Sequence, residues 1–309
     1  MDWTVSAADA GVRLDKFLAA ADRLGSRKRA SVALDRAKVF VNDVEAAASA
    51  GSTRLARGDR VRVWMDRPGS SRGRTTVRTG DLRILFEDES LIVLDKPAGL
   101  LAVPLERQEH ADSVVDQLVT HLRPKGKRKP LVVHRIDRDT SGLVVFAKTP
   151  VAQHALREQF KRHTVERVYR AVVYGHPAPP SGVWRDHLVW DSKALIQKST
   201  HPRDPKGKEA VCRYETLETF AATSLIEVRL ETGKRNQIRL QARLRGHTLV
   251  GERRYIYGPD ELRPVDFPRQ ALHAFRLAFL HPTSGAPLRF EAAMPPDIAA
   301  LVARLRKSS

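Results

Sequence analysis

The sequence contains one cysteine in 309 residues, and this scarcity limits its chemistry. A single thiol cannot form an internal disulfide, and it is too few for a structural zinc site built on cysteine. Cys212 lies in a stretch that predicts a strand, without a context that would favour a reactive thiolate. We therefore expect a reducing, cytoplasmic location and a packed, unreactive thiol.

Long hydrophobic runs and cofactor motifs are also absent. No apolar stretch approaches the length of a membrane-spanning helix, and the first residues lack the basic start and apolar core of a signal peptide. No Gly-x-Gly-x-x-Gly or phosphate-loop lysine motif occurs, and the eleven histidines lack metal-ligand spacing. We expect a protein outside the membrane that uses no cofactor and no metal.

Acidic residues are too few to balance the basic ones. The chain has 54 Lys and Arg against 36 Asp and Glu, a formal net charge of +18. Such an excess favours a polyanionic partner, because each phosphate contacted releases condensed counterions. No basic helix with a large aromatic apolar face points to a membrane surface. Nucleic acid is the predicted partner, and the alternative is a protein that is basic throughout for no functional reason.

The N-terminal residues predict a small α+β unit. Apolar spacing over residues 13–22 indicates an amphipathic helix, and Ser26 can cap a second helix. Cations at positions 27–29 crowd the first turn of that helix, where they oppose the helix dipole. An RNA phosphate would compensate them. A short strand at 39–41 follows, and we place the end of this unit at residue 65.

The rest of the chain divides into a linker and a larger domain. Residues 66–79 are rich in Gly, Ser, Thr and Arg, which predicts a flexible basic linker. Residues 80–309 contain many predicted strands and scattered helices without strict βα alternation, which favours an α+β fold. Residues 177–209 have no clear period, so they are either a turn-rich connection or an ordered insertion.

One segment of the larger domain combines a carboxylate with arginines. Asp137 lies between Arg135 and Arg138, in a short turn that joins two apolar runs predicted to be strands. Taken alone, such an aspartate is more often a solvated surface ion pair than a catalytic group. The basic stretch 123–130 just upstream is expected to contact phosphate or simply to be solvated.

Two groups of motifs resemble known families. In the N-terminal unit, Arg13-Leu14-Asp15-Lys16-Phe17-Leu18, Val39-Phe40-Val41-Asn42 and Gly58-Asp59 resemble the small RNA-binding module named after the fourth protein of the small ribosomal subunit. Ala37 and Asp43 stand where glycine is usual. The alternative is an appendage that only packs on the main domain.

The larger domain resembles the RluA-type RNA pseudouridine synthases over nearly all of residues 80–300. The motifs that carry this resemblance are Leu91 to Gly99, His134-Arg135-Ile136-Asp137-Arg138-Asp139-Thr140-Ser141-Gly142, Arg167-Val168-Tyr169-Arg170-Ala171, Thr232 to Arg239, Gly246-His247 with Tyr257-Gly258, and Leu272-His273-Ala274. The resemblance implies a mixed, largely antiparallel central sheet flanked by helices. It also implies isomerisation of uridine to pseudouridine in structured RNA.

Site roles follow from the same resemblance, position by position. The resemblance implies that Asp137 is the catalytic aspartate, that Tyr169 stacks on the target uracil, and that Arg239 is the cation paired with the aspartate. Arg135 would fill the space left by the flipped base, and Leu277 would help form an apolar base pocket. Asp137 could act as a nucleophile, as a stabiliser of sugar cation character, or as a base at the sugar.

This chain departs from the family pattern beside the expected counter-ion. Lys234, Arg235 and Asn236 replace the Arg-Thr-His that more usually precedes Gln-Ile-Arg, Ile136 replaces leucine, and Arg167 replaces lysine. None of these changes touches the carboxylate. We expect them to alter substrate details rather than activity.

The resulting hypothesis is a cofactor-independent, monomeric RNA pseudouridine synthase that flips its target base. Ribosomal RNA of the large subunit is favoured over transfer RNA, because resembling proteins with the N-terminal module typically modify it. The first alternative is a non-catalytic RNA-binding or ribosome-assembly factor that retains the fold. The second is a phosphotransferase, prompted by the faint similarity of residues 134–137 to a kinase catalytic loop, although the glycine-rich loop and Asp-Phe-Gly motif are missing.

Overall fold

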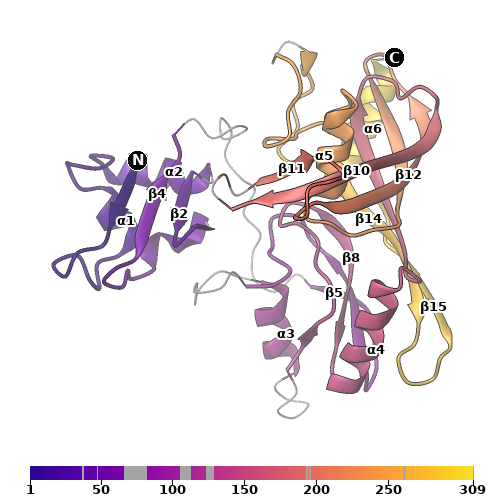
Figure 1. Cartoon of the computed structure of the whole chain (residues 1–309), viewed down its shortest axis with the longest axis horizontal. Coiled ribbons are helices and arrows are strands. Elements are labelled where there is room, and N and C mark those ends of the chain that lie inside the picture. The colour runs from indigo at the N-terminus through magenta and orange to yellow at the C-terminus, as the bar shows by residue number, and fades with distance from the viewer. Residues whose placement is uncertain are drawn as a thin grey trace.

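The computed structural model places two β-sheets in the chain, one small and N-terminal and one large (Figure 1). Several stretches named above, namely the expected linker, Ala37 and most of the basic stretch 123–130, lie outside the residues that the structure describes. The described residues are 1–36, 38–46, 48–65, 82–104, 113–122, 129–192, 194, 196–259 and 262–308.

The small sheet has four strands in the order β1-β4-β2-β3. Its elements are β1 (Asp2–Thr4), α1 (Leu14–Leu18), α2 (Arg27–Asp35), β2 (Val39–Val41), β3 (Val44–Glu45), the 3-10 helix η1 (Ala48–Ser52) and β4 (Arg60–Val63). The first helix is shorter than its sequence pattern predicts, since it ends at Leu18. Ser26 caps α2 as expected, because its hydroxyl accepts a hydrogen bond from the Arg29 amide. Asn42 and Asp43 adopt left-handed conformations, with φ of 50° and 62°, in the turn between β2 and β3.

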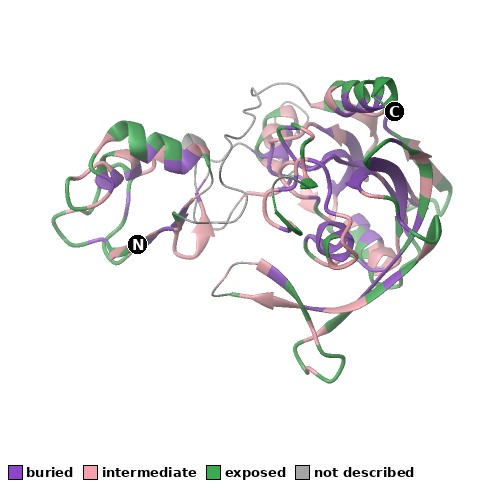
Figure 2. Ribbon diagram, turned by 90° about the horizontal axis from the view of Figure 1, so that it is seen from above, coloured by how far each residue is buried: buried purple, intermediate pink, exposed green. Residues whose placement is uncertain are grey.

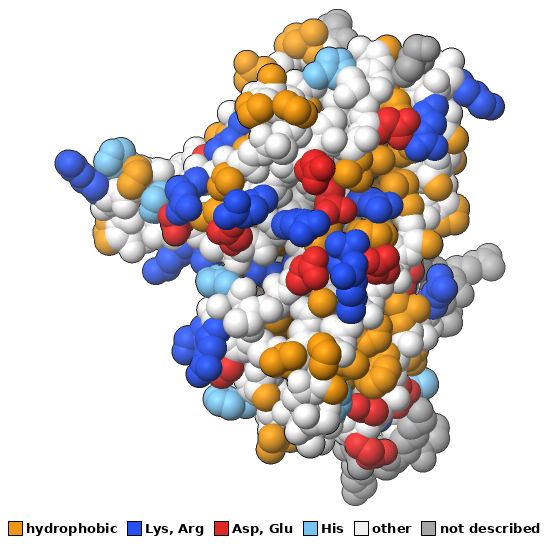
Figure 3. Space-filling view, turned by 90° about the vertical axis from the view of Figure 1, so that its right-hand side faces the viewer, with side chains coloured by type: hydrophobic (Ala, Val, Ile, Leu, Met, Phe, Trp, Pro, Cys, Tyr) orange, Lys and Arg blue, Asp and Glu red, His pale blue; other side chains and the backbone are white. Residues whose placement is uncertain are grey.

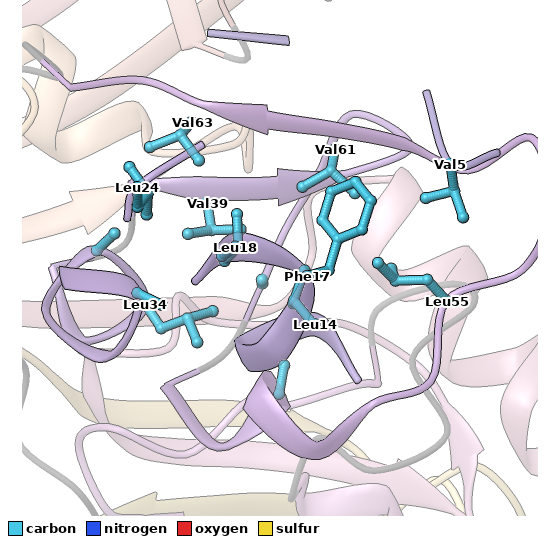
Figure 4. Packing of buried hydrophobic residues seen from close by; sticks show 14 of the residues in the cluster. Val5, Leu14, Phe17, Leu18, Leu24, Leu34, Val39, Leu55, Val61 and Val63 are labelled. Carbon is cyan, nitrogen blue, oxygen red and sulfur yellow. The ribbon is translucent and has the colours of Figure 1, made fainter. Parts of the chain in front are cut away.

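The two N-terminal helices pack against this sheet through a separate apolar core (Figure 4). Leu14 and Phe17 of α1 and Leu34 of α2 are at most 2% exposed. They meet Val39 and Val61, which are fully buried on the neighbouring strands β2 and β4. Burying each such side chain stabilises the unit by roughly 1.5–3 kcal/mol. The two helices therefore form one layer and the four-stranded sheet the other, which gives the small α+β unit that the sequence predicts.

The large sheet has eleven strands, mostly antiparallel, with the path β11-β10-β12-β13-β9-β14-β8-β6-β5. Strand β14 joins the two halves, because it pairs parallel with β8 and antiparallel with β9. This arrangement confirms the mixed, largely antiparallel sheet. Its strands are β5 (Arg83–Glu87), β6 (Leu91–Lys96), β7 (Leu131–Val132), β8 (Ser141–Ala147), β9 (Glu166–Tyr174), β10 (Ser181–Asp191), β11 (Ile196–Thr200), β12 (Lys208–Thr219), β13 (Thr223–Leu230), β14 (Leu272–Leu280) and β15 (Pro287–Glu291).

Four helices cover the large sheet, each through its own apolar cluster. They are α3 (Val114–Leu122), α4 (Pro150–Lys161), α5 (Gln237–Leu244) and α6 (Pro296–Lys307). Helix α5 packs on β9, β12 and β13, while α6 packs on a different cluster that includes Val172 and Leu225 of β9 and β13. In the other half, α3 packs on β6 and β8, and α4 packs on β8 and β14. Burial is consequently concentrated in the strands between the helices (Figure 2).

The unassigned region 177–209 forms the long β10–β11 hairpin and the start of β12, so the ordered insertion is the correct alternative. Strand β10 pairs with β12 over residues 181–188 and with β11 over residues 187–191. Only Trp184 and Leu188 of β10 are buried, and they stand four residues apart. This sparse apolar pattern concealed the strands, because their pairing depends on the backbone rather than on an alternating apolar face.

Cys212 lies fully buried in β12, as expected. Burial raises the pKa of its thiol to about 12, so the group stays protonated at neutral pH. Over the described part of the chain, no helix combines the length and apolar character needed to cross a membrane.

Gly142 permits the junction between β8 and β14. Its φ is +108°, and a Cβ there would lie 2.3 Å from the Ala274 carbonyl oxygen. We expect Gly142→Ala to lower the free energy of unfolding by more than about 2 kcal/mol, because the strained backbone and the clash add. Gly285→Ala is the control: its φ is +71°, but a Cβ there meets nothing within 4 Å, so a cost of about 1 kcal/mol is expected. Urea unfolding of both variants measures the difference, and equal costs would contradict it.

Candidate active site

The turn that carries Asp137 lies between β7 and β8 and is tied down by backbone contacts. The Thr140 amide donates to the Asp137 carbonyl at 3.1 Å, and the Gly99 amide donates to the Arg138 carbonyl at 2.9 Å. The second contact joins this turn to the loop after β6, which contains residues 97–100. Asp137 is therefore held by neighbours on a rigid sheet rather than by a free loop.

Lys96 reinforces that junction from below. Its side chain is fully buried at the end of β6, and its ammonium donates to the carbonyls of Pro97, Leu100 and Arg138, each at 2.8 Å. Burial lowers the pKa of Lys96 to about 7, opposed by the nearby charge of Asp139. Its three donors bridge the two loops, so Lys96 positions the turn without itself contacting the Asp137 side chain in the described structure.

Arg269 holds the other side of the turn. One of its nitrogens donates to the Asp139 carbonyl at 3.0 Å, and another lies 3.3 Å from the Ser141 hydroxyl. The guanidinium also forms a two-point contact with Asp297 at the start of α6, at 2.7 and 2.9 Å. Arg269 is 4% exposed. The turn is thus connected through Arg269, 130 residues beyond Asp139, to the C-terminal helix α6.

The carboxylate of Asp137 accepts two hydrogen bonds on one oxygen. Arg239 donates from Nη1 to Oδ2 at 3.1 Å, and Asn236 donates from Nδ2 to the same Oδ2 at 2.6 Å. Arg239 belongs to the first turn of α5, and Asn236 is the N-cap residue directly before that helix. The structure thus brings Arg239 beside Asp137. The expectation that none of the departures from the family pattern touches the carboxylate was wrong, because Asn236 is one of them and donates to it.

Arg239 is itself held by a buried carboxylate, Glu252. Its Nε and Nη2 donate to the two oxygens of Glu252, both at 2.7 Å. Glu252 also accepts the backbone amides of residues 253, 254 and 255. Burial would raise the pKa of Glu252, but the charge and hydrogen bonds of Arg239 outweigh it and lower that pKa to about 2. Burial alone would lower the pKa of Arg239, but the charge of Glu252 and its hydrogen bonds raise that pKa well above its ordinary value.

Sequence reasoning missed Glu252, although a signal existed. A glutamate that follows Gly251 in an otherwise apolar stretch, Leu249-Val250-Gly251, is placed to enter the interior. Gly251 has φ of +75°, and a Cβ there would lie 1.9 Å from the Arg269 carbonyl oxygen. The tight approach of these two segments brings Glu252 under Arg239.

A cavity of about 430 Å³ opens beside Asp137. Four of the five expected site residues line it, namely Asp137, Arg135, Tyr169 and Arg239. Leu277 does not line this cavity and packs instead in the apolar cluster around β8 and α4. Apolar walls come from other residues, including Ile136, Leu230, Ile238 and Leu272. A flat uncharged ring could be held there between apolar side chains.

Tyr169 forms part of the cavity wall from the middle of β9. It is 8% exposed and pairs with Ala274 of β14 and Val228 of β13. Burial raises the pKa of Tyr169 to about 12, so the phenol is neutral at physiological pH. Within the described residues no hydrogen bond to its hydroxyl occurs. The ring thus offers an apolar face rather than an acid or base.

His134, just before Arg135, has a structural position. Its ring stacks on Phe160 with centroids 4.6 Å apart, and its Nε2 accepts the Val145 amide at 3.1 Å. Burial, assisted by the charge of Arg167, lowers the pKa of His134 to about 3. The imidazole is therefore neutral and attaches the turn to β8 and α4.

Cations line the cavity, including Lys161, Arg167 and Lys234, and others lie elsewhere on the molecule. Arg135 is exposed, and Arg235 stacks over the Trp190 ring of β10 at 4.1 Å. Arg138 and Arg254 lie 3.7 and 3.9 Å from Glu45 of the N-terminal sheet. The described residues contain no cluster of three or more His, Cys, Asp or Glu side chains arranged to hold a metal ion. The site can therefore offer one carboxylate, an aromatic wall and several positive charges to a polyanionic substrate.

Comparison with solved structures defines the class of fold. The human RNA Pseudouridylate Synthase Domain Containing 4 protein aligns with a TM-score of 0.59 and 21% identity, over 72% of this chain and 93% of its own. The human RNA Pseudouridylate Synthase Domain Containing 1 protein aligns with a TM-score of 0.57 and 20% identity, over 75% and 97%. The large sheet and its helices are thus a pseudouridylate synthase fold.

Sequence comparisons identify the family. The family model described as RNA pseudouridylate synthase matches residues 90–244. Ribosomal large subunit pseudouridine synthase D of Zymomonas mobilis subsp. mobilis is 40% identical over 239 residues, 74% of each chain. An uncharacterized RNA pseudouridine synthase of Bacillus subtilis is 35% identical over 312 residues, covering 100% of this chain and 99% of the relative. The chain belongs to the RNA pseudouridylate synthase family, and it is an enzyme of that class that acts on RNA.

The buried Arg239–Glu252 pair predicts a specific acid sensitivity. Above pH 4.5 the carboxyl is ionised in both folded and unfolded states, so its stabilisation is fully present. As pH falls from 4.5 toward 2, only the unfolded state takes up the proton, and stability is lost. This shift corresponds to roughly 3 kcal/mol. We expect Glu252→Gln to be less stable than wild type by about that amount at pH 6, and the difference to shrink toward pH 2.

Urea unfolding at several pH values measures this prediction. Glu218→Gln is the control, because Glu218 forms an ion pair with Arg306 on the surface, where such pairs contribute little. A Glu252→Gln variant whose stability difference did not change with pH would contradict the assignment.

Proposed function

We propose that this enzyme isomerises specific uridines of large-subunit ribosomal RNA through Asp137. The observation that carries the proposal is the Asp137 carboxylate, held by Arg239 at 3.1 Å, in the wall of the same cavity as Tyr169. This places an acidic group, its compensating cation and an apolar ring around one space. No other cavity described in the structure combines these three features.

The reaction needs few chemical groups. Uracil leaves its nitrogen link to the sugar, turns within the site and rejoins the same sugar carbon through its carbon 5. Carbon 5 then loses its proton and the released nitrogen gains one, so the product has the same composition as uridine. No electrons are gained or lost overall, and no phosphate energy is needed. Asp137 acts at the sugar, as nucleophile, as base or as stabiliser of positive charge. Arg239 supplies the compensating charge, and the cavity walls keep the free base from leaving.

Base flipping explains the aromatic wall and the cations. Extruding a nucleotide from its stack costs a few kcal/mol. Stacking on Tyr169 returns roughly 1–3 kcal/mol, and phosphate contacts offset the remainder. Arg135 is exposed at the opening, where its side chain can occupy the space that the flipped base leaves.

The names of relatives support the choice of RNA. The relatives in Zymomonas mobilis and Nitrosomonas europaea are both named ribosomal large subunit pseudouridine synthase D. The second is 35% identical over 309 residues, which cover 96% of this chain and 85% of the relative. By this similarity, we take ribosomal RNA of the large subunit as the substrate and transfer RNA as the alternative.

We further propose that residues 1–65 are an RNA-binding module. The cations Arg27, Lys28 and Arg29 are all exposed in the first turn of α2, where an anion would satisfy both their charge and the helix terminus. In contrast, the face of the molecule in Figure 3 mixes Lys and Arg with Asp and Glu rather than gathering one sign. The positive charge that is free to meet phosphate therefore includes the start of α2.

Asp137→Asn tests the catalytic proposal. We expect pseudouridine formation to fall by at least roughly 1,000-fold, because the amide can neither attack nor accept a proton at the sugar. Tyr169→Phe keeps the stacking face and loses no hydrogen bond, so a loss below about 10-fold is expected. Asp139→Asn is the matched control in the same turn and is expected to stay active. Pseudouridine is mapped in ribosomal and transfer RNA from cells that express each variant.

Two outcomes would contradict the proposal. An Asp137→Asn enzyme with wild-type activity would exclude the carboxylate mechanism. Pseudouridines that depend on this protein in transfer RNA alone would exclude ribosomal RNA as the substrate while leaving the chemistry intact.

Replacing Arg27, Lys28 and Arg29 by alanine tests the N-terminal module. We expect weaker RNA binding and a smaller dependence of log Kd on log salt, by up to about 0.7–0.9 per lost phosphate contact. The control replaces Arg304, Arg306 and Lys307, three exposed cations of α6, and removes the same charge elsewhere. Fluorescence anisotropy from 50 to 300 mM salt, about the range over which such contacts weaken, provides the measurement. Equal slopes for the two variants would contradict a role specific to α2.

A further inference from the structure

We infer that Asn236 is a positioning residue that determines which oxygen of Asp137 reacts. The inference rests on the proposed function, because it assumes that the Asp137 carboxylate acts at the sugar. Its basis is a chain of hydrogen bonds that runs from the backbone of β11 through Tyr255 and Asn236 to the carboxylate. One member of this hydrogen-bond series, Asn236, is a position at which the sequence departs from the pattern of the family it resembles.

The two donors to Asp137 meet at a single oxygen. Asn236 Nδ2 lies 2.6 Å and Arg239 Nη1 lies 3.1 Å from Oδ2. Within the described residues, no hydrogen bond reaches Oδ1. Since a carboxylate oxygen with two donors is less basic and less nucleophilic than one with none, Oδ1 is the oxygen available for reaction.

The amide of Asn236 has only one orientation that satisfies its neighbours. A carboxylate can only accept, so the amide nitrogen must face Asp137. The amide oxygen then accepts the Tyr255 hydroxyl at 3.1 Å. That hydroxyl in turn accepts the Gln197 backbone amide of β11 at 3.0 Å. Each group thus donates a hydrogen bond to the next. The first donor is a backbone amide, which cannot act as an acceptor, so the order of donors and acceptors is fixed.

The backbone explains why an asparagine suits this position. Asn236 has φ of 52° and ψ of 25°, the left-handed conformation, directly before α5. Asparagine tolerates this conformation better than most residues, and its short side chain reaches Asp137 from there. The residue is 9% exposed, so water competes little for its amide. Histidine, which more usually stands at this position in the resembling family, also tolerates this conformation and can donate a hydrogen bond.

Arg239 is also fixed in place, so it cannot move with the Asp137 carboxylate if that carboxylate rotates. Its other nitrogens are occupied by Glu252 at 2.7 Å. Arg239 alone would allow the carboxylate to turn about its Cβ–Cγ bond and to exchange the two oxygens. With Asn236 present, exchange would break a second, shorter bond. Arg239 therefore supplies charge, and Asn236 supplies orientation.

Asn236→Gly tests this inference, because glycine keeps the left-handed backbone and the charge and removes the whole amide, both the donor to Asp137 and the acceptor for the Tyr255 hydroxyl. We expect kcat for RNA isomerisation to fall roughly 10- to 100-fold, the value of a hydrogen bond to a charged group. KM and RNA affinity are expected to stay close to wild type, and the thermal midpoint to fall only modestly, because one buried hydroxyl loses its acceptor. Asn236→His restores a donor, so kcat is expected to recover most of that loss.

Tyr255→Phe provides an independent test that leaves Asn236 in place. It removes the hydroxyl that orients the amide but keeps the ring, which lies 5.3 Å from the Arg239 guanidinium. We expect kcat to fall by about 3- to 10-fold with unchanged RNA affinity, because a neutral hydrogen bond is worth less than a charged one. Tyr257→Phe is the control, since Tyr257 is 56% exposed.

Single-turnover kinetics, RNA binding and thermal melting are measured for all variants beside wild type and Asp137→Asn. If wild type forms no pseudouridine, or if Asp137→Asn is fully active, the proposed function fails. If these two behave as expected but Asn236→Gly keeps wild-type kcat, only the positioning role is overturned. The positioning role is also overturned if Asn236→Gly loses only thermal stability or RNA affinity and keeps its kcat. Should Asn236→Gly not fold, Tyr255→Phe with wild-type kcat would overturn it.

Discussion

The ion pair between Arg239 and Glu252 is the interaction on which the active site depends. Both side chains are buried, and a buried charge without a partner is strongly destabilising. The two-point contact at 2.7 Å, together with three backbone donors to Glu252, compensates that burial. Because these contacts fix the guanidinium, its remaining nitrogen points at Asp137. The carboxylate thus receives a counter-ion whose position does not depend on solvent or substrate.

The turn around Asp137 shows a second constraint, which is attachment from two directions. Lys96 joins the turn to β6, and Arg269 joins it to β14 and α6. Both cations donate to backbone carbonyls, so they fix the path of the chain rather than any single side chain. Strand β14 also pairs with β8, which follows the Asp137 turn, and with β9, which carries Tyr169. The positions of Asp137 and Tyr169 are therefore both fixed relative to β14. Their separation is consequently a property of the sheet.

The N-terminal unit lies within reach of this site. Glu45 approaches Arg138 and Arg254, and Leu101 of the larger unit packs in the N-terminal apolar cluster. Both ion pairs are long, at 3.7 and 3.9 Å, and only partly buried, so RNA phosphates could compete for the two arginines. The same arginines would then serve the contact between the units without RNA and the contact with RNA during binding.

Local sequence patterns determined much of this protein. Apolar spacing located α1, the Ser26 cap located α2, and ordered motifs indicated Asp137, Tyr169, Arg135 and Arg239, which line one cavity. These features depend on near neighbours or on motifs with recognisable order. The sequence did not show β10 and β11, whose pairing is made by the backbone, and it misplaced Leu277 relative to the cavity.

Only the tertiary structure decided the contacts of Asp137. Glu252 and Tyr255 lie more than 100 residues beyond Asp137, and the Gln197 amide donates to the Tyr255 hydroxyl from another hairpin. Hydrogen bonds among such residues follow from the path of the chain, because no local pattern records which buried polar groups will meet. The sequence by itself thus indicated the residues that we propose carry the chemistry. The fold decided which of them meet, and through Asn236 and Arg239 it decided which oxygen of Asp137 is left free.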